Sequence, residues 1–413
     1  MIQLTEEQWR RLDVVDRIER GEMTIAEGAT ALGISPRQMK RIRKRVSGRG
    51  AAAVLHGNQG RSPKHRIGKQ VRARIVQLRR TLYRGFNDQH FTEKLVEVEE
   101  LPISRSSVRR ILREARVEAV RGRRPTKHRK RRDRRPQAGQ MILWDGSRHD
   151  WLEGRGPRLC LMAAIDDATG ELLPGGHFVD QECTVGYLRV LRDLVCAKGV
   201  PLVAYMDRHG TLKRNDNKWS REEQLAGRRE PTQVKRALDD LGIRVLYALS
   251  PQAKGRVERL WGTLQDRLVS ELRLAGATTA AEANVVLEKY RPSHNRRFAI
   301  PARETHQAWR PSPGDDAVDA ICGLQYVRIV ANNNTVRIGG QIIDIPHKPR
   351  SRTYAKAYVV VRQLLDGRYR VYYGNELIAE AAGSPPTEST GEERSIIVAE
   401  VKREKARRKR MQG

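Results

Sequence analysis

The sequence predicts a chain of several domains: all-α helix-turn-helix units at the N-terminal end, an α/β core with a mixed sheet, and a small C-terminal β-barrel. Three observations predict this fold class. Apolar residues recur at helical spacing up to residue 120, and short apolar runs alternate with helical stretches over 139–310. Short strand patterns separated by turn residues then follow residue 320. The length of 413 residues fits about three domains.

The chain carries a large excess of positive charge. Lysine and arginine number 80 against 49 acidic residues, which gives a net charge of +31. Such an excess indicates a polyanionic partner, because binding along a phosphate backbone releases counterions. An anionic membrane surface is the alternative, but no apolar run is long enough to span a bilayer and no signal peptide follows Met1. We therefore expect a nucleic-acid-binding protein with no membrane partner.

The cysteines indicate a reducing, cytoplasmic environment. Cys160, Cys183, Cys196 and Cys322 form no CxxC pair, and each lies in an apolar context. We expect buried free thiols, and no zinc site is predicted.

Residues 1–56 are predicted to form a helix-turn-helix domain. Thr24 can cap one helix, Gly33 suits a tight turn, and Ser35 followed by Pro36 is typical of a helix start. The second helix would present to the major groove a face made of Arg37, Gln38, Lys40, Arg41 and Lys44. The alternative is an ordinary helical hairpin with a solvated basic face. Turn chemistry and the basic face together favour DNA binding.

Residues 67–120 are predicted to form a second helix-turn-helix domain. Ser104 would cap a helix whose apolar face contains Val108, Ile111, Leu112 and Ala115. Its opposite face carries four candidate DNA contacts, Arg105, Arg109, Arg110 and Arg113. Two such units would let the protein read a long DNA site.

Basic linkers flank this second unit. Residues 57–66, which include Arg61, suit either a minor groove or a solvated link. Residues 121–138 include Arg129, Lys130 and Arg131, and the run is too polar to form a core. Its position between a DNA reader and the core favours contact with the phosphate backbone over simple solvation.

Two aspartates of the core each follow a short apolar run. Residues 141–144 lead into Asp145, and residues 202–206 lead into Asp207, as at the ends of buried strands. A helical pattern starts after Pro251, and one of its faces contains Glu258, Trp261, Gly262 and Gln265. Strand ends and a packed helix can bring three carboxylates together, and such hard oxygen ligands suit Mg²⁺ or Mn²⁺. Two ions can clamp the attacking and leaving oxygens of a phosphoryl transfer.

Three other aspartates are excluded from the metal site: Asp150, Asp166 and Asp167. The last two begin a DDATG turn, where aspartates usually accept hydrogen bonds from backbone amides. Around the acids we expect strands at 158–165, 171–179, 201–205 and 243–248, and helices at 184–198 and 232–241.

These stretches resemble the DDE transposases and retroviral integrases, in particular bacterial insertion-sequence transposases with an integrase-type, ribonuclease H-like core. The matching segments are ILWDGSRHDW, CLMAAIDDATGELLPGGHF, AYMDRHG, LSPQAKGRVERLWGTLQDRL and YRPSHNRRFAIPARE. The resemblance implies that residues 139–310 are the catalytic core. It also implies that Asp145, Asp207 and Glu258 are its catalytic, metal-binding acids.

The same resemblance implies an enzyme of the bacterial cytoplasm, associated with the nucleoid, that binds the terminal inverted repeats of an insertion sequence. Two Mg²⁺ or Mn²⁺ ions per site would support cleavage of 3′ ends and their transfer into double-stranded target DNA. A homo-oligomer, a dimer or a tetramer, would hold the paired ends. The chain departs from the pattern at Gln265, where integrases often carry a basic residue; Lys254 or Arg267 could supply that charge.

An insertion at 213–231 lengthens the segment between Asp207 and Glu258. It places Trp219 among basic residues, either to stack on a splayed base at a DNA end or simply within a surface loop or lid. Lys254 and Arg259 are further candidate DNA contacts. A later helix is expected to end near Tyr290, and the resemblance places residues 294–297 near DNA, although His294 could be structural.

After a linker at 311–316, residues 320–383 are expected to form a barrel of the SH3 type. The expected strands cover 326–330, 335–338, 341–345, 358–362, 369–373 and 376–379. Residues 384–413 read as a basic, flexible tail.

Two other functions are open to this sequence. One is a non-catalytic DNA-binding regulator with a decayed core, which the three acids argue against. The other is a ribonuclease H-like nuclease without strand joining, which the double DNA reader argues against.

Overall fold

The computed structural model describes residues 4–55, 66–120, 132–207, 229–248, 255–347 and 353–387, together with Leu212, Trp219, Glu223 and Gln224. The chain divides into two compact units, Met1–Arg74 and Ile75–Gly413. The first is helical, and the second contains further helices and all the described strands. No helix within these ranges combines the length and the apolar character needed to cross a membrane.

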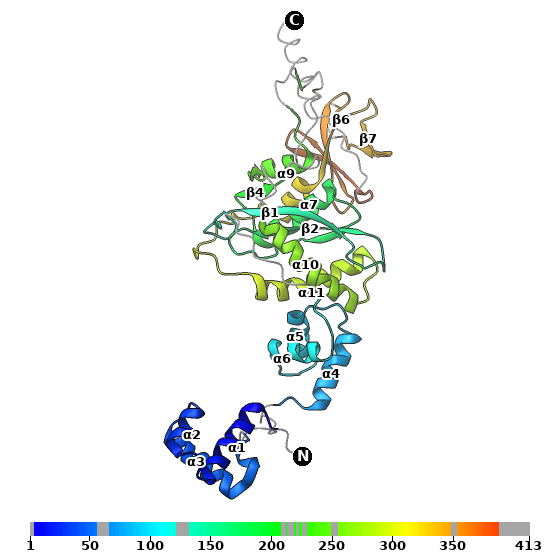
Figure 1. Ribbon diagram of the computed structural model, residues 1–413. Helices are drawn as coiled ribbons and strands as arrows, with labels where there is room; N and C mark the ends of the chain where they lie inside the picture. Colours follow the sequence, from blue (N-terminus) through cyan, green and yellow to red (C-terminus); the bar gives the residue numbers. More distant parts are fainter. Residues whose placement is uncertain are drawn as a thin grey trace. The chain divides into compact units, whose positions relative to one another are not determined.

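The first unit contains helices α1 (Glu6–Glu19), α2 (Ile25–Ala31) and α3 (Pro36–Arg49) and the 3-10 helix η1 (Gly50–Val54) (Figure 1). Thr24 and Ser35 each accept a hydrogen bond at a helix start, so both predicted caps are confirmed. Gly33 has a φ of +63°, which permits the turn between α2 and α3. The common core contains Val14, Val15, Ile18, Ala29, Met39 and Ile42.

Three more helices follow, α4 (Lys69–Arg80), α5 (Asp88–Glu97) and α6 (Arg105–Glu114). The predicted Ser104 cap of α6 is confirmed, and Val108, Ile111 and Leu112 are buried as expected. Helix α5 begins at Asp88, where the Asn87 side chain accepts a hydrogen bond from the His90 amide.

The core contains a five-stranded sheet in the order β3-β2-β1-β4-β5 (Figure 1). Its strands are β1 (Ile142–His149), β2 (Leu159–Asp166), β3 (His177–Val179), β4 (Val203–Met206) and β5 (Arg244–Tyr247). Strands β1, β2 and β3 pair antiparallel, whereas β4 and β5 run parallel to β1. The predicted mixed sheet is therefore confirmed.

One strand was predicted too long. Residues 171–179 give only an isolated bridge at Leu172 and the short strand β3. Between them lie Pro174, which has no amide hydrogen to donate, and Gly175, whose φ is +84°. Both residues interrupt a strand.

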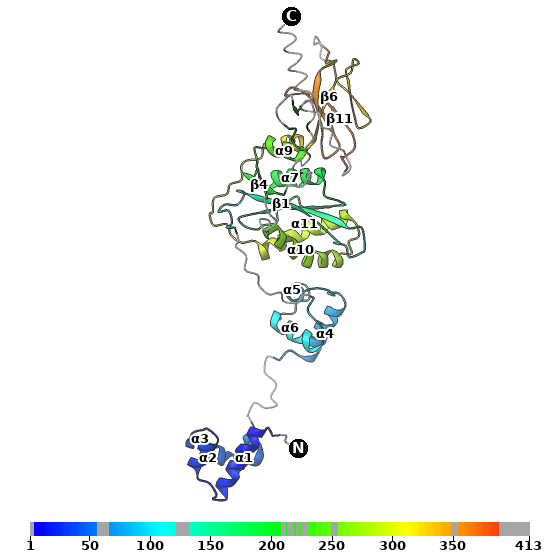
Figure 2. The same cartoon turned by 45° about the horizontal axis from the view of Figure 1, so that its top comes forward.

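Helices cover both faces of this sheet. Helices α7 (Thr184–Lys198) and α9 (Gln233–Asp240) lie on one side, and α10 (Gly255–Leu274) and α11 (Ala280–Phe298) on the other (Figures 1 and 2). Side chains of β1 alternate between the two layers: Ile142 and Trp144 pack in the cluster with α7, and Met141 and Leu143 pack in the cluster with α10. The sheet is thus buried on both faces.

Two helices differ from the sequence-based expectations. Helix α11 does not end near Tyr290 but continues to Phe298 through Pro292, with Tyr290 and His294 buried on one face. Helix α12 (Asp315–Cys322) begins within the predicted linker, and its Val318 and Cys322 are buried one turn apart. Its i, i+4 apolar spacing was too short a pattern to be recognised beside a Pro/Gly-rich stretch.

The C-terminal strands are β6 (Leu324–Ile329), β7 (Thr335–Ile338), β8 (Gln341–Asp344), β9 (Tyr358–Gln363), β10 (Tyr369–Tyr373) and β11 (Glu376–Ala381). All the strands expected here are confirmed, with bounds shifted by at most two residues. They form an antiparallel sheet in the order β11-β10-β9-β6 and a separate β7-β8 hairpin. Among residues 324–347 and 353–387 the strands do not pair into a closed barrel.

Candidate active site

The sheet places Asp145 and Asp207 at one level. Strands β1 and β4 are adjacent and parallel, and Leu143 pairs with Tyr205. Asp145 lies two residues beyond Leu143, and Asp207 two residues beyond Tyr205. The register therefore sets the two aspartates side by side where β4 ends.

Both aspartates lie on the face of the sheet that α10 covers. Side chains alternate along a strand, so Asp145 shares its face with Leu143, and Asp207 shares its face with Tyr205. Leu143 and Tyr205 both belong to the apolar cluster that contains the buried side of α10. The acids and the helix that carries Glu258 are therefore in the same layer.

Two residues of α10 contact β1 directly. The indole Nε1 of Trp261 donates a hydrogen bond to Asp145 Oδ2 at 3.1 Å. One turn later, Gln265 Nε2 donates to Ser147 Oγ at 3.2 Å. Helical periodicity predicted that Trp261 and Gln265 share a face with Glu258, but it gave no partner for either side chain.

The donor groups suit a divalent cation. Asp145 and Asp207 offer carboxylate oxygens, the donors that Mg²⁺ and Mn²⁺ prefer. Glu258 is exposed in the first turn of α10. Within the described ranges, however, no three acid, histidine or cysteine side chains come close enough together to hold a metal ion. The structure thus aligns the two aspartates and does not bring Glu258 into a three-ligand cluster with them.

A further carboxylate, Glu182, lies next to Gly146 on the α7 side of β1. It is not among the candidates predicted from the sequence. The Tyr187 hydroxyl donates a hydrogen bond to Glu182 Oε1 at 2.5 Å. Burial, Glu182 and Asp145 raise the pKa of the Cys160 thiol to about 12, and burial and Glu182 raise the pKa of Tyr187 well above its ordinary value. Both groups are therefore protonated and neutral near pH 7, so they add no negative charge beside the acids.

Similarity to other protein sequences identifies the family of this chain. Over 398 residues the chain is 34% identical to y4bF of Sinorhizobium fredii, which is named as a transposase, and the match covers 92% of this chain and 84% of the relative. The chain belongs to the same family of transposases. It is also 29% identical over 410 residues to the transposase for insertion sequence IS1202 of Streptococcus pneumoniae, covering 88% of this chain and 85% of that protein. No family model matches the chain.

Solved integrase structures show weaker likeness. A simian T-cell lymphotropic virus intasome chain matches with 13% identity and a TM-score of 0.30, covering 75% of this chain and 99% of that one. The HTLV-2 integrase catalytic core domain in complex with magnesium matches with 16% identity and a TM-score of 0.25, covering 37% and 85%. TM-scores this low support no conclusion, so the family assignment rests on the transposase relatives.

The three aspartates excluded from the metal site all bind backbone amides, as predicted for Asp166 and Asp167. Asp166 accepts hydrogen bonds from the Gly139 and Thr169 amides, and Asp150 accepts one from the Gly154 amide. Asp167 is fully buried and binds the guanidinium groups of Arg132 and Arg256. The exclusion of Asp167 thus agrees with its contacts, although arginine partners were not foreseen.

Most described candidates for DNA contact are exposed. This holds for Arg37, Gln38, Lys40, Arg41 and Lys44 on α3, for Arg105, Arg109 and Arg110 on α6, and for Arg259 on α10. Arg113 is partly buried, because Asp88 binds its guanidinium at 2.6 Å. Trp219 is 42% exposed, and the Arg229 guanidinium lies 5.1 Å from its ring centre. Arg61, Arg129, Lys130, Arg131 and Lys254 lie outside the described residues.

Of the two residues that could replace the charge missing at Gln265, Arg267 is bound within the protein instead. Its guanidinium is buried and binds Glu93 of α5 at 2.6 and 3.1 Å, and it stacks on Phe298 at 5.0 Å. Nearby, Glu271 binds both His90 and Lys94 of α5. These charge-assisted bonds hold α5 against α10.

His294 has a structural role. It is buried, and its ring lies between those of Tyr290 and Phe298. Burial, with a smaller contribution from the Arg267 charge, lowers the pKa of His294 to about 4. It is therefore neutral in the folded protein at pH 7, which suits packing rather than contact with phosphate.

This pKa predicts acid sensitivity of the core. The folded-state pKa of His294, about 4, lies below the ordinary value of 6.5, so its contribution to stability is full above pH 6.5 and is lost as the pH falls toward 4. Between pH 7.5 and pH 5 the free energy of unfolding should fall by about 2 kcal/mol from this residue. Denaturant titrations at both pH values measure the loss. His294→Gln should be less stable at pH 7.5 but should lose less on acidification; an equal loss would contradict the assignment.

Trp261→Phe is predicted to slow DNA nicking without preventing folding. The substitution removes the donor to Asp145 and keeps an aromatic ring, and a hydrogen bond to a charged group is worth about 1.5–3 kcal/mol, so a loss of roughly tenfold or more is expected. Trp151→Phe is the matched control, because its indole donates to the Ser147 carbonyl instead. Nicking rates and melting temperatures should show a comparable loss of stability in both variants and a loss of rate in Trp261→Phe alone. Equal rates would show that the indole does not support Asp145.

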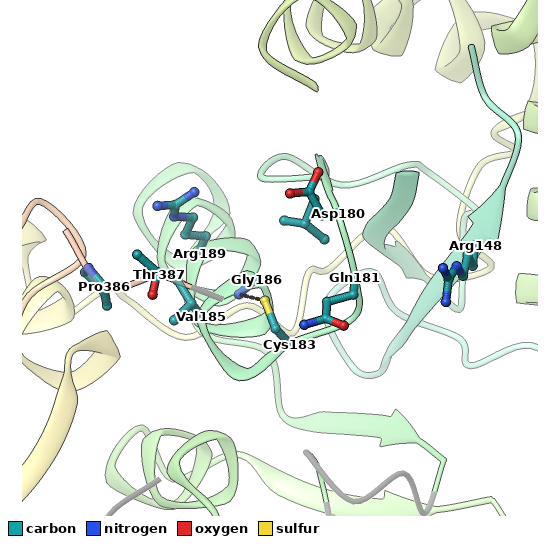
Figure 3. A pocket seen from close by; sticks show the side chains of 10 residues that line it. Arg148, Asp180, Gln181, Cys183, Val185, Gly186, Arg189, Pro386 and Thr387 are labelled. Atoms are coloured by element: carbon teal, nitrogen blue, oxygen red, sulfur yellow. Dashed lines mark hydrogen bonds between the residues drawn. The ribbon is translucent and has the colours of Figure 1, made fainter. Parts of the chain in front are cut away.

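A separate pocket lies on the α7 side of β1. It encloses about 520 Å³ and is lined by residues that include Arg148, Asp180 and Arg189 (Figure 3). Figure 3 also shows Pro386 and Thr387 at its edge and the Gly186 amide donating to Cys183 Sγ. Arg148 lies three residues after Asp145 on β1, so the two side chains are on opposite faces of the sheet. The pocket is therefore distinct from the acid site.

Proposed function

We propose that this transposase binds the terminal inverted repeats of its mobile element, cuts the DNA to leave 3′ hydroxyl ends, and joins those ends to target DNA. The observation that carries the proposal is the position of Asp145 and Asp207, which lie level on adjacent parallel strands beneath the helix that carries Glu258. The named transposase relatives agree with this class of reaction.

Asp145, Asp207 and Glu258 would hold two Mg²⁺ or Mn²⁺ ions. When bound, the ions supply Lewis-acid activation of the attacking water or hydroxyl and stabilise the leaving oxygen. Trp261 orients the Asp145 carboxylate through its indole N–H. The sheet holds the two aspartates in register, so the ligands are positioned before DNA binds.

DNA recognition is assigned to the N-terminal helices. The exposed polar face of α3 and the arginine-rich face of α6 would read the end sequence in the major groove, while the basic linkers at 57–66 and 121–138 would contact phosphates. The C-terminal strands would complete a small barrel of the SH3 type. A dimer or tetramer would hold two ends together.

Metal-dependent nicking tests this function. The purified chain is incubated with a labelled duplex that joins an element end to flanking DNA, with Mg²⁺, with Mn²⁺ or with a chelator. We expect a nick at the element boundary that leaves a 3′ hydroxyl, and no product with the chelator. Binding to the end without any nick under either metal would instead favour a non-catalytic regulator.

A further inference from the structure

The buried aspartate that follows β2 binds two arginine side chains. Asp167 follows β2 directly, and its amide donates to the Met141 carbonyl at the start of β1. Its carboxylate accepts two hydrogen bonds from Arg132, at 2.6 and 3.1 Å, and one from the Arg135 amide at 2.9 Å. Arg256 donates a further bond at 2.5 Å. One carboxylate thus joins three segments of the chain.

Two of these segments are important for the proposed chemistry. Arg132 belongs to the basic segment that precedes the core, and Arg256 lies in the first turn of α10, two residues before Glu258. The Arg256 side chain also donates to the Arg132 carbonyl, and Arg134 donates to the Asp167 carbonyl. The segment before the core and the start of the glutamate helix are therefore bound to the same point.

The placement of Arg256 requires a compensating charge. Backbone amides make the first turn of a helix electropositive, so a cation there is unfavourable by itself. Asp167 supplies the negative charge in a site where its side chain is 0% exposed and that of Arg256 is 20% exposed. A buried carboxylate is tolerated only with such partners, and breaking this pair would leave Arg132 as the one arginine bound to Asp167 among the described residues. The pair therefore resists any displacement of the first turn of α10.

We propose that Asp167 is a positioning residue of the active site: it holds Arg256 and thereby fixes the first turn of α10, with Glu258, relative to Asp145 and Asp207. This inference rests on the proposed function. Arg132 binds the same carboxylate, so Asp167 also fixes the end of the basic linker that follows the N-terminal helices. This part of the linker would therefore help to position the active site, in addition to any contact that it makes with phosphate.

The main alternative is that Arg256 contacts a DNA phosphate directly. Substitution of Arg256 would affect different measured quantities in the two cases. Loss of a phosphate contact weakens DNA binding and reduces its salt dependence, whereas loss of a positioning contact lowers the rate at saturating DNA and leaves affinity intact. Misplacement by about 1 Å can cost roughly 100-fold in rate.

The test compares Arg256→Gln, Arg256→Lys, Asp167→Asn and the double variant Asp167→Asn/Arg256→Gln in the full chain. Asp319→Asn is the matched control, because it removes a carboxylate that binds Arg192 at 2.8 Å between α7 and α12. Three quantities are measured: the single-turnover nicking rate at saturating end DNA, the Kd for that DNA, and hydrogen exchange of the amides at 255–260.

We expect Arg256→Gln and Asp167→Asn to slow nicking by roughly 10- to 100-fold with Kd within about twofold, and to speed amide exchange at 255–260. Arg256→Lys should restore part of the rate, the double variant should be no slower than either single one, and Asp319→Asn should match the wild type. If Asp167→Asn does not fold, the comparison of Arg256→Gln with Arg256→Lys tests the proposal by itself. An unchanged rate with weaker binding in Arg256→Gln, or unchanged exchange, would overturn the proposal. A wild type that never nicks DNA would instead show that the proposed function is wrong, even if exchange responds as expected.

Discussion

Replacing any one of Asp145, Asp207 or Glu258 by its amide is expected to reduce nicking and joining by at least ~10³-fold. Each change removes a negatively charged ligand from the proposed divalent-cation site, and a loss of about 4 kcal/mol of transition-state stabilisation corresponds to this factor. Binding to the element end should stay within about twofold, because we assign DNA recognition to helices α3 and α6, which do not contain the acids. Gel-based cleavage and mobility-shift assays on the same preparations measure both.

Asp150→Asn is the control for these substitutions. Asp150 lies in the segment that follows β1, but its carboxylate accepts a hydrogen bond from the Gly154 amide on the other end of a tight turn. This variant should cut and join like the wild type. If Asp145→Asn, Asp207→Asn or Glu258→Gln kept near-normal Mg²⁺-dependent activity, that residue would not be a ligand, and the doubt would fall first on Glu258, which the structure leaves exposed.

The second large effect is expected in recognition. Substituting Arg37, Gln38 and Arg41 of α3 by alanine should lower the preference for the element end over scrambled duplex by roughly 100-fold or more, because these exposed side chains lie on the face assigned to base reading. Affinity for scrambled DNA should change much less. Competition mobility-shift assays with both duplexes give the ratio directly.

A control variant tests whether the loss of positive charge alone explains the reduced preference. Arg11→Ala in α1 with Arg20→Ala at its C-terminal end removes the same number of positive charges from exposed or half-exposed side chains of the same unit. This pair should weaken both duplexes alike and preserve the preference. A similar loss of preference in the α1 pair, or an intact preference in the α3 variant, would place recognition elsewhere.

Much of the site could be predicted because it depends on local pattern. Apolar runs that end in Asp145 and Asp207 indicate buried strands, and i, i+3 and i+7 spacing placed Glu258, Trp261 and Gln265 on one face. What could not be predicted is which distant side chains meet. The Trp261–Asp145 bond joins positions 116 residues apart, and the Arg267–Glu93 pair joins positions 174 apart.

The wrong expectations have a common physical cause. Arg267 is a possible source of the charge that Gln265 lacks, yet α5 covers it and supplies a carboxylate. Helix α11 continues past Tyr290 because burial of His294 outweighs the local cost of Pro292. In both cases tertiary packing, which a single sequence does not display, overrides a local rule.

Strand transfer from a pre-cut end tests the central claim most directly. A duplex that mimics the cleaved element end, carrying either a 3′ hydroxyl or a 3′ deoxy terminus, is incubated with the chain, Mg²⁺ and a supercoiled target plasmid. We predict covalent joining of the labelled end to the plasmid with the 3′ hydroxyl, none with the 3′ deoxy terminus, and none with Asp145→Asn. Nicking of DNA without any joined product, under conditions where the end is bound, would contradict the account and leave a nuclease in place of a transposase.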